Sequence, residues 1–305
     1  MFHLTALLAL SQMGSSPSAQ GLASIVSPNV AEVVSWLPPD CEAMTVVQEP
    51  GAIHPLADHY SIRDGISLLA FLELPDPEHP LTFKYDFVVE GSRNSRMPKD
   101  LGLMPFDGCF VAAMRQDQLK GVEAAVKKLA NHTGMVGGRN TYVVQAKVMQ
   151  DSWTWYVSFD HEYMYSSTSK DFYLQVLGRE GKPHADRALP DSLEQWKYIE
   201  PGAPYFSVRQ LPPMIAQRDR AIGYAAWLQR DKKRFDLLFI SDDKGRAKQF
   251  ASGWKDLLKQ EGWDHADQPN DVDARISTLS LDAQADGGEK PIYYIAAIIG
   301  HAIIV

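Results

Sequence analysis

The sequence predicts an α+β fold, built mostly from antiparallel sheets with helices packed on one face. Alternating apolar and polar residues, typical of half-buried strands, recur more often than helical patterns. These strand patterns often follow one another directly, whereas a parallel sheet would show a regular series of strands and helices. With 305 residues, the chain is long enough for two domains or one large domain.

The clearest strand pattern is 152–159, in which Trp153, Trp155, Val157 and Phe159 share one face. Short gaps separate it from two further strand patterns, 142–149 and 162–166, so we expect a three-stranded antiparallel meander over 141–166. Other strands are expected at 83–89, 106–114, 203–210, 222–228, 234–240, 274–281 and 292–299.

Four segments have helical spacing. Apolar side chains three or four positions apart predict an amphipathic helix over 119–129. Asp64 can cap a helix that runs to Leu72, and Ser169 can cap one that ends at Gly178. The fourth helix is expected from about Gly245 to Gln260.

The chain divides into a signal peptide or flexible leader (1–36), a first α+β domain (37–185) and a second α+β domain (186–305). The polar segment 178–192, with its glycines and prolines, is the expected linker. A faint repeat leaves open whether the two halves are related. It aligns Leu37–Gln48 with Ile199–Gln210, matching Pro39 with Pro201, Thr45 with Ser207, Val46 with Val208 and Gln48 with Gln210.

The N-terminus resembles a secretory signal peptide. A short apolar run, Phe2–Leu10, precedes the small residues Gly14–Ala19, which allow cleavage after Ala19. We therefore expect export to the periplasm or the extracellular space. The alternative is a cytoplasmic protein in which the run is a frayed leader or a small buried helix. Nine apolar residues are too few for a transmembrane helix, which needs about 20.

Charge and cysteine content exclude some functions. The net charge of −8 and the pI of about 5.6 argue against nucleic-acid binding by phosphate neutralisation. The two cysteines, Cys41 and Cys109, are too few for a disulfide-dense scaffold. They are either one bridge in an exported protein or two buried thiols.

Several segments together resemble uncharacterised exported bacterial α+β proteins. The resemblance lies in the Leu-Pro-x-Asp turn into a strand (Leu37–Val47), the strand Phe106–Met114, the tryptophan-rich hairpin, the helix region Ser166–Leu177 and the second turn and strand, Glu200–Arg209. It covers about half of the chain and implies export and a duplicated fold. It implies no activity.

The sequence contains no G-x-S-x-G nucleophile elbow, Walker loop, dinucleotide-binding glycine pattern or H-E-x-x-H motif. His161-Glu162 begins like a zinc-protease motif, but Tyr165 occupies the position of the second histidine. Gly134, Gly137 and Gly138 are expected to form a turn rather than a phosphate cradle.

Aspartate precedes histidine three times, at Asp58-His59, Asp160-His161 and Asp264-His265. Turn formation explains these pairs, since aspartate favours turns. The alternatives are a metal site of His54, Asp58 and His59 on one loop, or a hydrolase that uses His59, His161 or His265.

Two other groups have a structural and a functional interpretation. Asp264, Asp267, Asp271 and Asp273 have the composition of a calcium loop but not the spacing, so a solvated acidic loop is expected. Trp153, Trp155 and Tyr156 are either core residues or an aromatic binding platform.

The C-terminal segment 291–305 is strongly apolar. It is either a buried final strand or a segment that pairs with a partner, with a second copy of the chain, or with a membrane surface.

These observations favour an exported, non-enzymatic binding or envelope-associated module of unknown ligand. The alternative is a hydrolase with a site assembled from dispersed histidine and aspartate residues. We assign no catalytic, cofactor-binding or metal-binding residue and expect no cofactor. The sequence leaves enzyme activity uncertain, with the absence of activity favoured.

Overall fold

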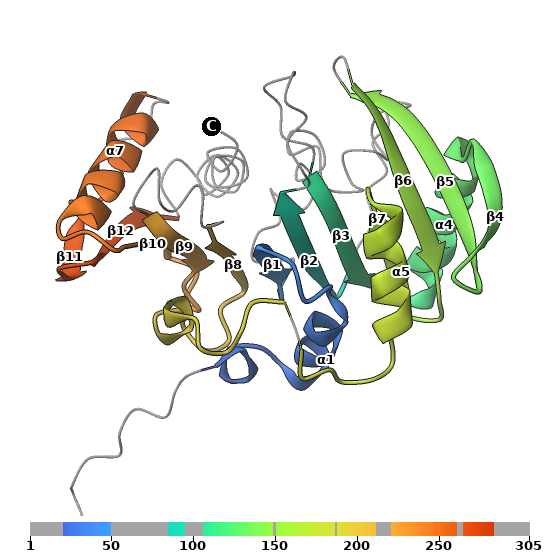
Figure 1. Cartoon of the computed structure of the whole chain (residues 1–305), viewed down its shortest axis with the longest axis horizontal. Helices are drawn as coiled ribbons and strands as arrows, with labels where there is room; N and C mark the ends of the chain where they lie inside the picture. The colour runs from blue at the N-terminus through green and yellow to red at the C-terminus, as the bar shows by residue number, and fades with distance from the viewer. Residues whose placement is uncertain are drawn as a thin grey trace, which may run out of the picture.

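A computed structural model describes residues 21–49, 85–94, 106–148, 151–186, 188–211, 221–260 and 265–283. Its centre is one sheet of 12 strands in the order β11-β12-β10-β9-β8-β1-β2-β3-β7-β6-β5-β4 (Figure 1). Every pair of neighbouring strands is antiparallel, which confirms the predicted α+β class. The strands are β1 (Ala43–Val47), β2 (Phe87–Asn94), β3 (Phe106–Ala113), β4 (His132–Val136), β5 (Arg139–Val148), β6 (Asp151–Phe159), β7 (Tyr163–Ser167), β8 (Tyr205–Gln210), β9 (Ala221–Leu228), β10 (Arg234–Ser241), β11 (Asn270–Asp273) and β12 (Ile276–Asp282).

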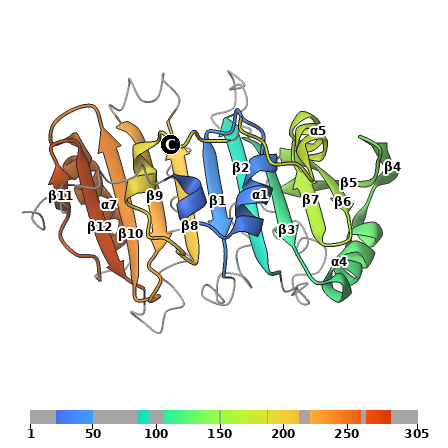
Figure 2. The ribbon, with the colours of Figure 1, turned by 90° about the horizontal axis from the view of Figure 1, so that it is seen from below.

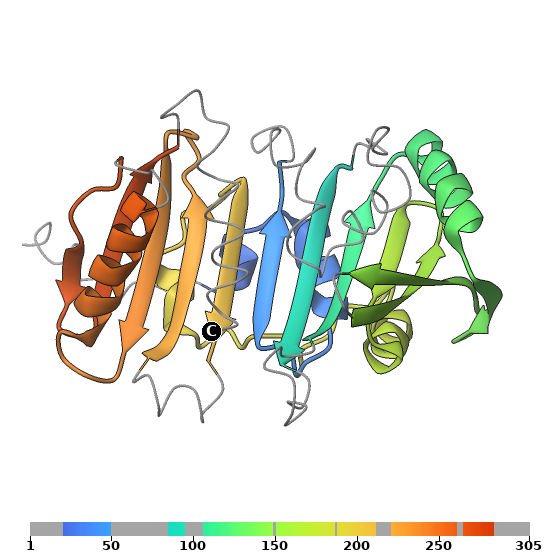
Figure 3. The ribbon, with the colours of Figure 1, turned by 90° about the horizontal axis from the view of Figure 1, so that it is seen from above.

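Helices cover both faces of this sheet, not one face as the sequence suggested. α4 (Gln116–Leu129) and α7 (Arg246–Gln260) pack near opposite ends of one face (Figure 3). The other face is covered by α1 (Pro28–Trp36), α5 (Lys170–Arg179) and the short helices η1 (Leu22–Ser24) and η3 (Glu194–Lys197) (Figure 2). Because side chains alternate between the faces of a strand, the central strands contribute to two apolar cores, one on each face.

The predicted meander is present as β5, β6 and β7, which are consecutive in the sheet. Three of the four predicted helices are confirmed as α4, α5 and α7. Ser169 caps α5 as expected, because its side chain accepts a hydrogen bond from the backbone N–H of Phe172. The predicted helix 64–72 and strand 292–299 lie outside the described residues.

The two halves meet at a local two-fold axis between β1 and β8. The faint repeat aligns Thr45 with Ser207, and the antiparallel register places these two residues directly opposite each other. Their hydroxyl groups hydrogen bond at 3.0 Å. In the first half, α1 precedes the meander β1-β2-β3, α4 follows on the opposite face, and β7 returns beside β3. In the second half, η3 precedes the meander β8-β9-β10, α7 follows on the opposite face, and β12 returns beside β10. The topology therefore repeats on both sides of this axis.

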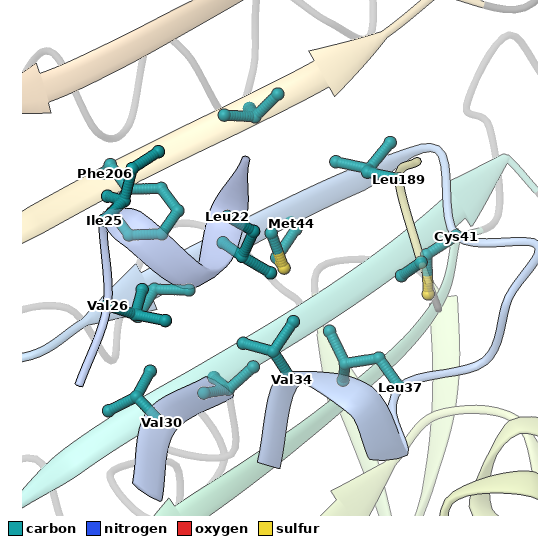
Figure 4. Packing of buried hydrophobic residues seen from close by; sticks show 14 of the residues in the cluster. Leu22, Ile25, Val26, Val30, Val34, Leu37, Cys41, Met44, Leu189 and Phe206 are labelled. Atoms are coloured by element: carbon teal, nitrogen blue, oxygen red, sulfur yellow. The ribbon is translucent and has the colours of Figure 1, made fainter. Parts of the chain in front are cut away.

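Part of the expected leader belongs to the packed protein. Residues 22–36 contain η1 and α1, and Leu22 and Val34 are fully buried in the core of the α1 face (Figure 4). A flexible leader that extends to residue 36 is therefore wrong for this segment. The segment folds because its apolar residues recur at helical spacing and form an almost uncharged face, which packs against the sheet.

The expected linker, 178–192, is not a simple solvated connection. Ala188 and Leu189 are buried in the core of the α1 face. The pairing of β1 with β8 continues the sheet across residue 185, and the two predicted domains share this sheet. No helix in the described ranges is long and apolar enough to cross a membrane.

Candidate functional site

The Asp160-His161 pair forms a turn between β6 and β7. The Asp160 carboxylate accepts a 2.7 Å hydrogen bond from the backbone N–H of His161. The His161 side chain is 95% exposed and lies 3.8 Å from the same carboxylate. The geometry is that of an aspartate stabilising its own turn.

The other two Asp-His pairs do not complete a site with it. Asp58-His59 and Asp264 lie outside the described residues, as does His54. His265 is exposed near β12. Since β12 and β7 are seven strand spacings apart, His161 and His265 are separated by about 30 Å along the sheet. These two histidines cannot act on one substrate atom.

The acidic loop residues bind separate partners. Asp267 pairs with Arg234, and Asp271 pairs with Lys248 at 2.7 Å and accepts a 2.7 Å hydrogen bond from Ser277. Asp273 accepts a hydrogen bond from the backbone N–H two residues further on. Across the part of the chain that the structure describes, no three His, Cys, Asp or Glu side chains are grouped to hold a metal ion.

The aromatic and glycine motifs also have structural roles. Trp155 is fully buried on the α4 face. Tyr156 points to the other face, where its ring lies 6.0 Å from that of Tyr173. The side chain of Trp153 lies outside the described part of the structure. Gly137 and Gly138 have φ angles of +61° and +81° and connect β4 to β5 as a tight hairpin turn.

A cluster of charged and phenolic side chains, here called the Arg139 cluster, lies directly after this turn. It consists of Arg139, Asp160, Tyr165 and Glu180. One guanidinium nitrogen of Arg139 donates to Glu180 at 2.6 Å and to Asp160 at 3.2 Å. The guanidinium carbon lies 4.8 Å from the centre of the Tyr165 ring, whose hydroxyl donates to Glu180 at 2.6 Å.

Each member of the cluster comes from a different element. Arg139 begins β5, Asp160 follows β6, Tyr165 is in the middle of β7, and Glu180 is the C-cap of α5. A carboxylate at a helix C-terminus is unfavourable by itself, so Glu180 depends on the cation that faces it. The cluster therefore ties the β4–β5 hairpin to α5 and to the β6–β7 turn.

The surroundings keep these groups in defined protonation states. Burial and the hydrogen bond to Glu180 raise the pKa of Tyr165 well above its ordinary value. Burial also tends to raise the pKa of Asp160, but the backbone N–H of His161, the hydrogen bond with Glu180 and the charge of Arg139 together lower it below the ordinary value. Burial opposes the charge on Arg139, yet its hydrogen bonds to Glu180 and Tyr165 raise its pKa. Tyr165 is thus a neutral phenol beside the charged groups of Arg139 and Asp160.

One nitrogen of Arg139, Nη1, is buried without a hydrogen-bond partner in the structure. The hydroxyl of Ser158 lies on the same face, directly opposite Tyr165 and beside the Tyr173 hydroxyl. Thr141 and Tyr173 next to them share a 2.7 Å hydrogen bond. These groups face the protein interior, so the cluster acts as a support and does not present a reactive group to solvent.

The supported element, β4, is an edge of the sheet. Its sequence, His-Thr-Gly-Met-Val, contains no proline and none of the charged residues Lys, Arg, Asp or Glu, and Met135 is 69% exposed. Asn131 fixes the start of the strand by accepting a 2.6 Å hydrogen bond from the backbone N–H of Gln145. The Arg139 cluster fixes its end. Among the described residues, β4 pairs with β5 alone.

The opposite edge of the sheet has features that discourage pairing. β11 has only four residues, two of which are aspartates, and its register with β12 shifts between Asp271 and Asp273. Short length, charge and bulges are the usual protection of edge strands. Because β4 has the first of these features but neither charge nor a bulge, we take β4 as the candidate binding site.

Sequence reasoning missed both parts of this site. Residues 132–136 have no strict alternation, and the glycines beside them predicted only a turn. Arg139, Tyr165 and Glu180 are up to 41 positions apart, and nothing in their spacing indicated that they meet. The one available signal was the pair of glycines followed by the strand pattern at 141, which is typical of a hairpin.

Comparisons with known proteins show little similarity. No protein-family model and no curated protein matches the chain. Two solved structures match 88% of this chain. One, described as "Structure of crystal form IV of TP0453", has a TM-score of 0.42, 6% identity and 96% of its own chain covered. The other, "Structure of crystal form III of TP0453", has a TM-score of 0.45, 8% identity and 97% of its chain covered.

Proposed function

We propose that this chain is an exported, non-enzymatic binding module, and that its partner is an extended protein segment that pairs with β4 as an additional strand. The observation that carries the proposal is the difference between the two sheet edges. β11 has charge and a register shift that oppose pairing, whereas β4 is uncharged and presents Met135 to solvent.

The backbone of β4 suits this mode of binding. In a two-residue hairpin the residues that flank the turn form a hydrogen-bonded pair, and such pairs then alternate along the strands. Val136 and Gly134 therefore direct their N–H and C=O groups toward β5. Thr133 and Met135 direct theirs to the open edge, where an added strand gains affinity from main-chain hydrogen bonds.

The firm attachment of β4 to the rest of the protein also favours binding. Asn131 at its start and the Arg139 cluster at its end hold the strand in an extended conformation before a partner arrives. A partner then orders only its own segment, which lowers the entropic cost of association. An apolar side chain on the partner strand packs on Met135 and supplies specificity.

Site-specific photo-crosslinking in the native host tests the binding proposal. A benzophenone amino acid replaces either Met135 in β4 or Val272 in β11, which is 45% exposed and is the matched control. We expect a crosslinked protein adduct from position 135 only. The change Thr133→Pro removes one outward N–H and is tolerated on an edge strand, so it should abolish that adduct while the protein stays folded. An adduct that survives this change, or equal adducts at both positions, contradicts the proposal.

Export rests on the N-terminal pattern and is tested separately. Cleavage after Ala19 leaves Leu22 and the rest of η1 in the mature chain, so it removes nothing that the described core needs. We expect a new N-terminus at Gln20 in the envelope or extracellular fraction. An intact Met1 in the cytosol contradicts this part of the proposal.

A further inference from the structure

Two cysteines that are 68 positions apart in the sequence come together in the core of the α1 face. Cys41 precedes β1 and is 5% exposed, and Cys109 lies in β3 and is 3% exposed. Figure 4 shows Cys41 beside Leu37 among the apolar side chains of this core. Both are free thiols in the structure.

Gly91 creates the space in which the two thiols meet. It lies in β2, directly opposite Cys109 in β3. The sulfur of Cys109 is 3.7 Å from the carbonyl oxygen of Gly91. A Cβ atom at Gly91 would lie only 2.7 Å from the sulfur of Cys41, so the Cys41 side chain occupies the place where a side chain on β2 would stand.

The two thiols are neighbours, because the Cys41 sulfur lies at the place of a Cβ atom on Gly91, and Gly91 is the cross-strand partner of Cys109. The nearby Cys109 side chain and burial raise the pKa of Cys41 well above its ordinary value. Cross-strand neighbours on one face have Cβ atoms about 5 Å apart, and the Cys41 sulfur lies at the Cβ position of such a neighbour of Cys109. The Cys41 sulfur is therefore within reach of the Cys109 side chain, whose sulfur it must approach to about 2 Å to form a disulfide.

We propose that Cys41 and Cys109 are a disulfide-forming pair that closes the segment between them when the chain folds under oxidising conditions. Its occurrence in the cell rests on the proposed export, because exported proteins meet such conditions. The oxidant is a disulfide compound or a disulfide oxidase. The two thiols lose two protons and two electrons to form one S–S bond, and the disulfide of the oxidant is reduced to two thiols.

Burial determines when the bond forms. The thiolate is the attacking species, and a buried thiol with a raised pKa supplies little of it. The bond therefore forms during folding, before the core of the α1 face closes. Once folded in the reduced state, the protein resists oxidation.

Refolding of the purified full chain tests the proposal. The reduced, unfolded protein is refolded either with reduced and oxidised glutathione or with excess dithiothreitol. Trypsin then releases Cys41 in the peptide that ends at Arg63 and Cys109 in Asp100–Arg115. We expect these two peptides to be linked after the oxidising refolding only. For a closed loop of this length in a chain of 305 residues, the oxidised protein should unfold at a temperature about 7 °C higher.

Two variants are the controls. Cys109→Ala and Cys41→Ala should each give no linked peptide and a melting temperature that dithiothreitol does not change. We also expect folded, reduced wild-type protein to acquire the bond at least about tenfold more slowly than the refolding chain. Two alkylatable thiols after oxidising refolding, or a disulfide between two chains, overturn the proposal. Because this experiment uses purified protein, it fails or succeeds independently of export.

Discussion

Replacement of Gly223 by alanine tests the packing at the junction of β8 and β9. An added Cβ atom would lie 2.5 Å from the backbone oxygen of Arg209 and 2.5 Å from the Nε2 atom of Gln195. Gln195 is 2% exposed, and its amide donates a 3.3 Å hydrogen bond to the same oxygen. A methyl group fits there only if β8 and β9 separate or if the Gln195 amide leaves its place.

The expected loss of stability follows from three contributions. Insertion of a methyl group into a packed core costs about 1–3 kcal/mol. Displacement of the Gln195 amide leaves a buried polar group without its partner, which costs about 1–3 kcal/mol. Alanine in a strand recovers about 0.5–1 kcal/mol relative to glycine. We therefore expect Gly223→Ala to lower the free energy of unfolding by about 3 kcal/mol.

Urea unfolding followed by tryptophan fluorescence measures this loss, provided that the m-value is unchanged. The matched control is Gly253→Ala in α7, where no atom lies within 4 Å of the added Cβ. This control should gain up to about 1 kcal/mol because alanine favours the helix. In the Gly223→Ala background, Gln195→Ala should restore part of the loss, since it removes one of the two clashing groups. A Gly223→Ala protein as stable as the wild type would refute this account of the junction.

Three further predictions concern the β5–β7 end of the sheet. Tyr165→Phe removes a 2.6 Å hydrogen bond to the Glu180 carboxylate and should lower the free energy of unfolding by about 1.5–3 kcal/mol in the same urea assay. Ser169→Ala removes the cap of α5 and should cost about 1 kcal/mol, measured by thermal unfolding. The pKa of Asp160 is lower in the folded protein, so its contribution to stability is complete above the ordinary value of 3.8 and is lost as the pH falls through the folded pKa. Asp160→Asn should therefore flatten the loss of stability as the pH falls below the ordinary value of 3.8, and an unchanged acid dependence would contradict this assignment.

The strands and helices of this chain could be predicted from the sequence where local pattern determines them. The alternation of apolar and polar residues around Trp155 predicted β6, because successive side chains of a strand point to opposite faces of the sheet. Ser169 predicted the start of α5 because a serine cap acts on the helix that directly follows it. These signals are contained in a few neighbouring residues and need no knowledge of the rest of the fold.

The number of sheets, the two helical layers and the candidate site could not be predicted in this way. The sequence does not show that Thr45 pairs with Ser207, and this pair joins the two halves into one sheet. The face of the sheet that a helix covers depends on where the chain after the helix rejoins the sheet. That position is also determined by contacts between residues far apart in the sequence. The Arg139 cluster brings together side chains from four different parts of the chain. An edge strand has a neighbouring strand on one side only, which depends on the strand order of the whole sheet.

The topology also shows how the two edge strands, β4 and β11, differ in origin. In the half that begins at β8, α7 is followed by two strands, of which β12 returns beside β10 and β11 is the edge. In the half that begins at β1, β7 and β6 occupy the equivalent places, and the β4–β5 hairpin is additional. This extra hairpin carries Arg139 and exposes Met135, and the described residues of the other half contain no counterpart to it. β11, which belongs to the repeated part of the topology, is an edge strand protected by charge. β4, which belongs to the additional hairpin, is an uncharged edge strand held by the Arg139 cluster. An addition needed only for stability would be expected to carry the same protection as β11, so the difference favours a binding role for β4.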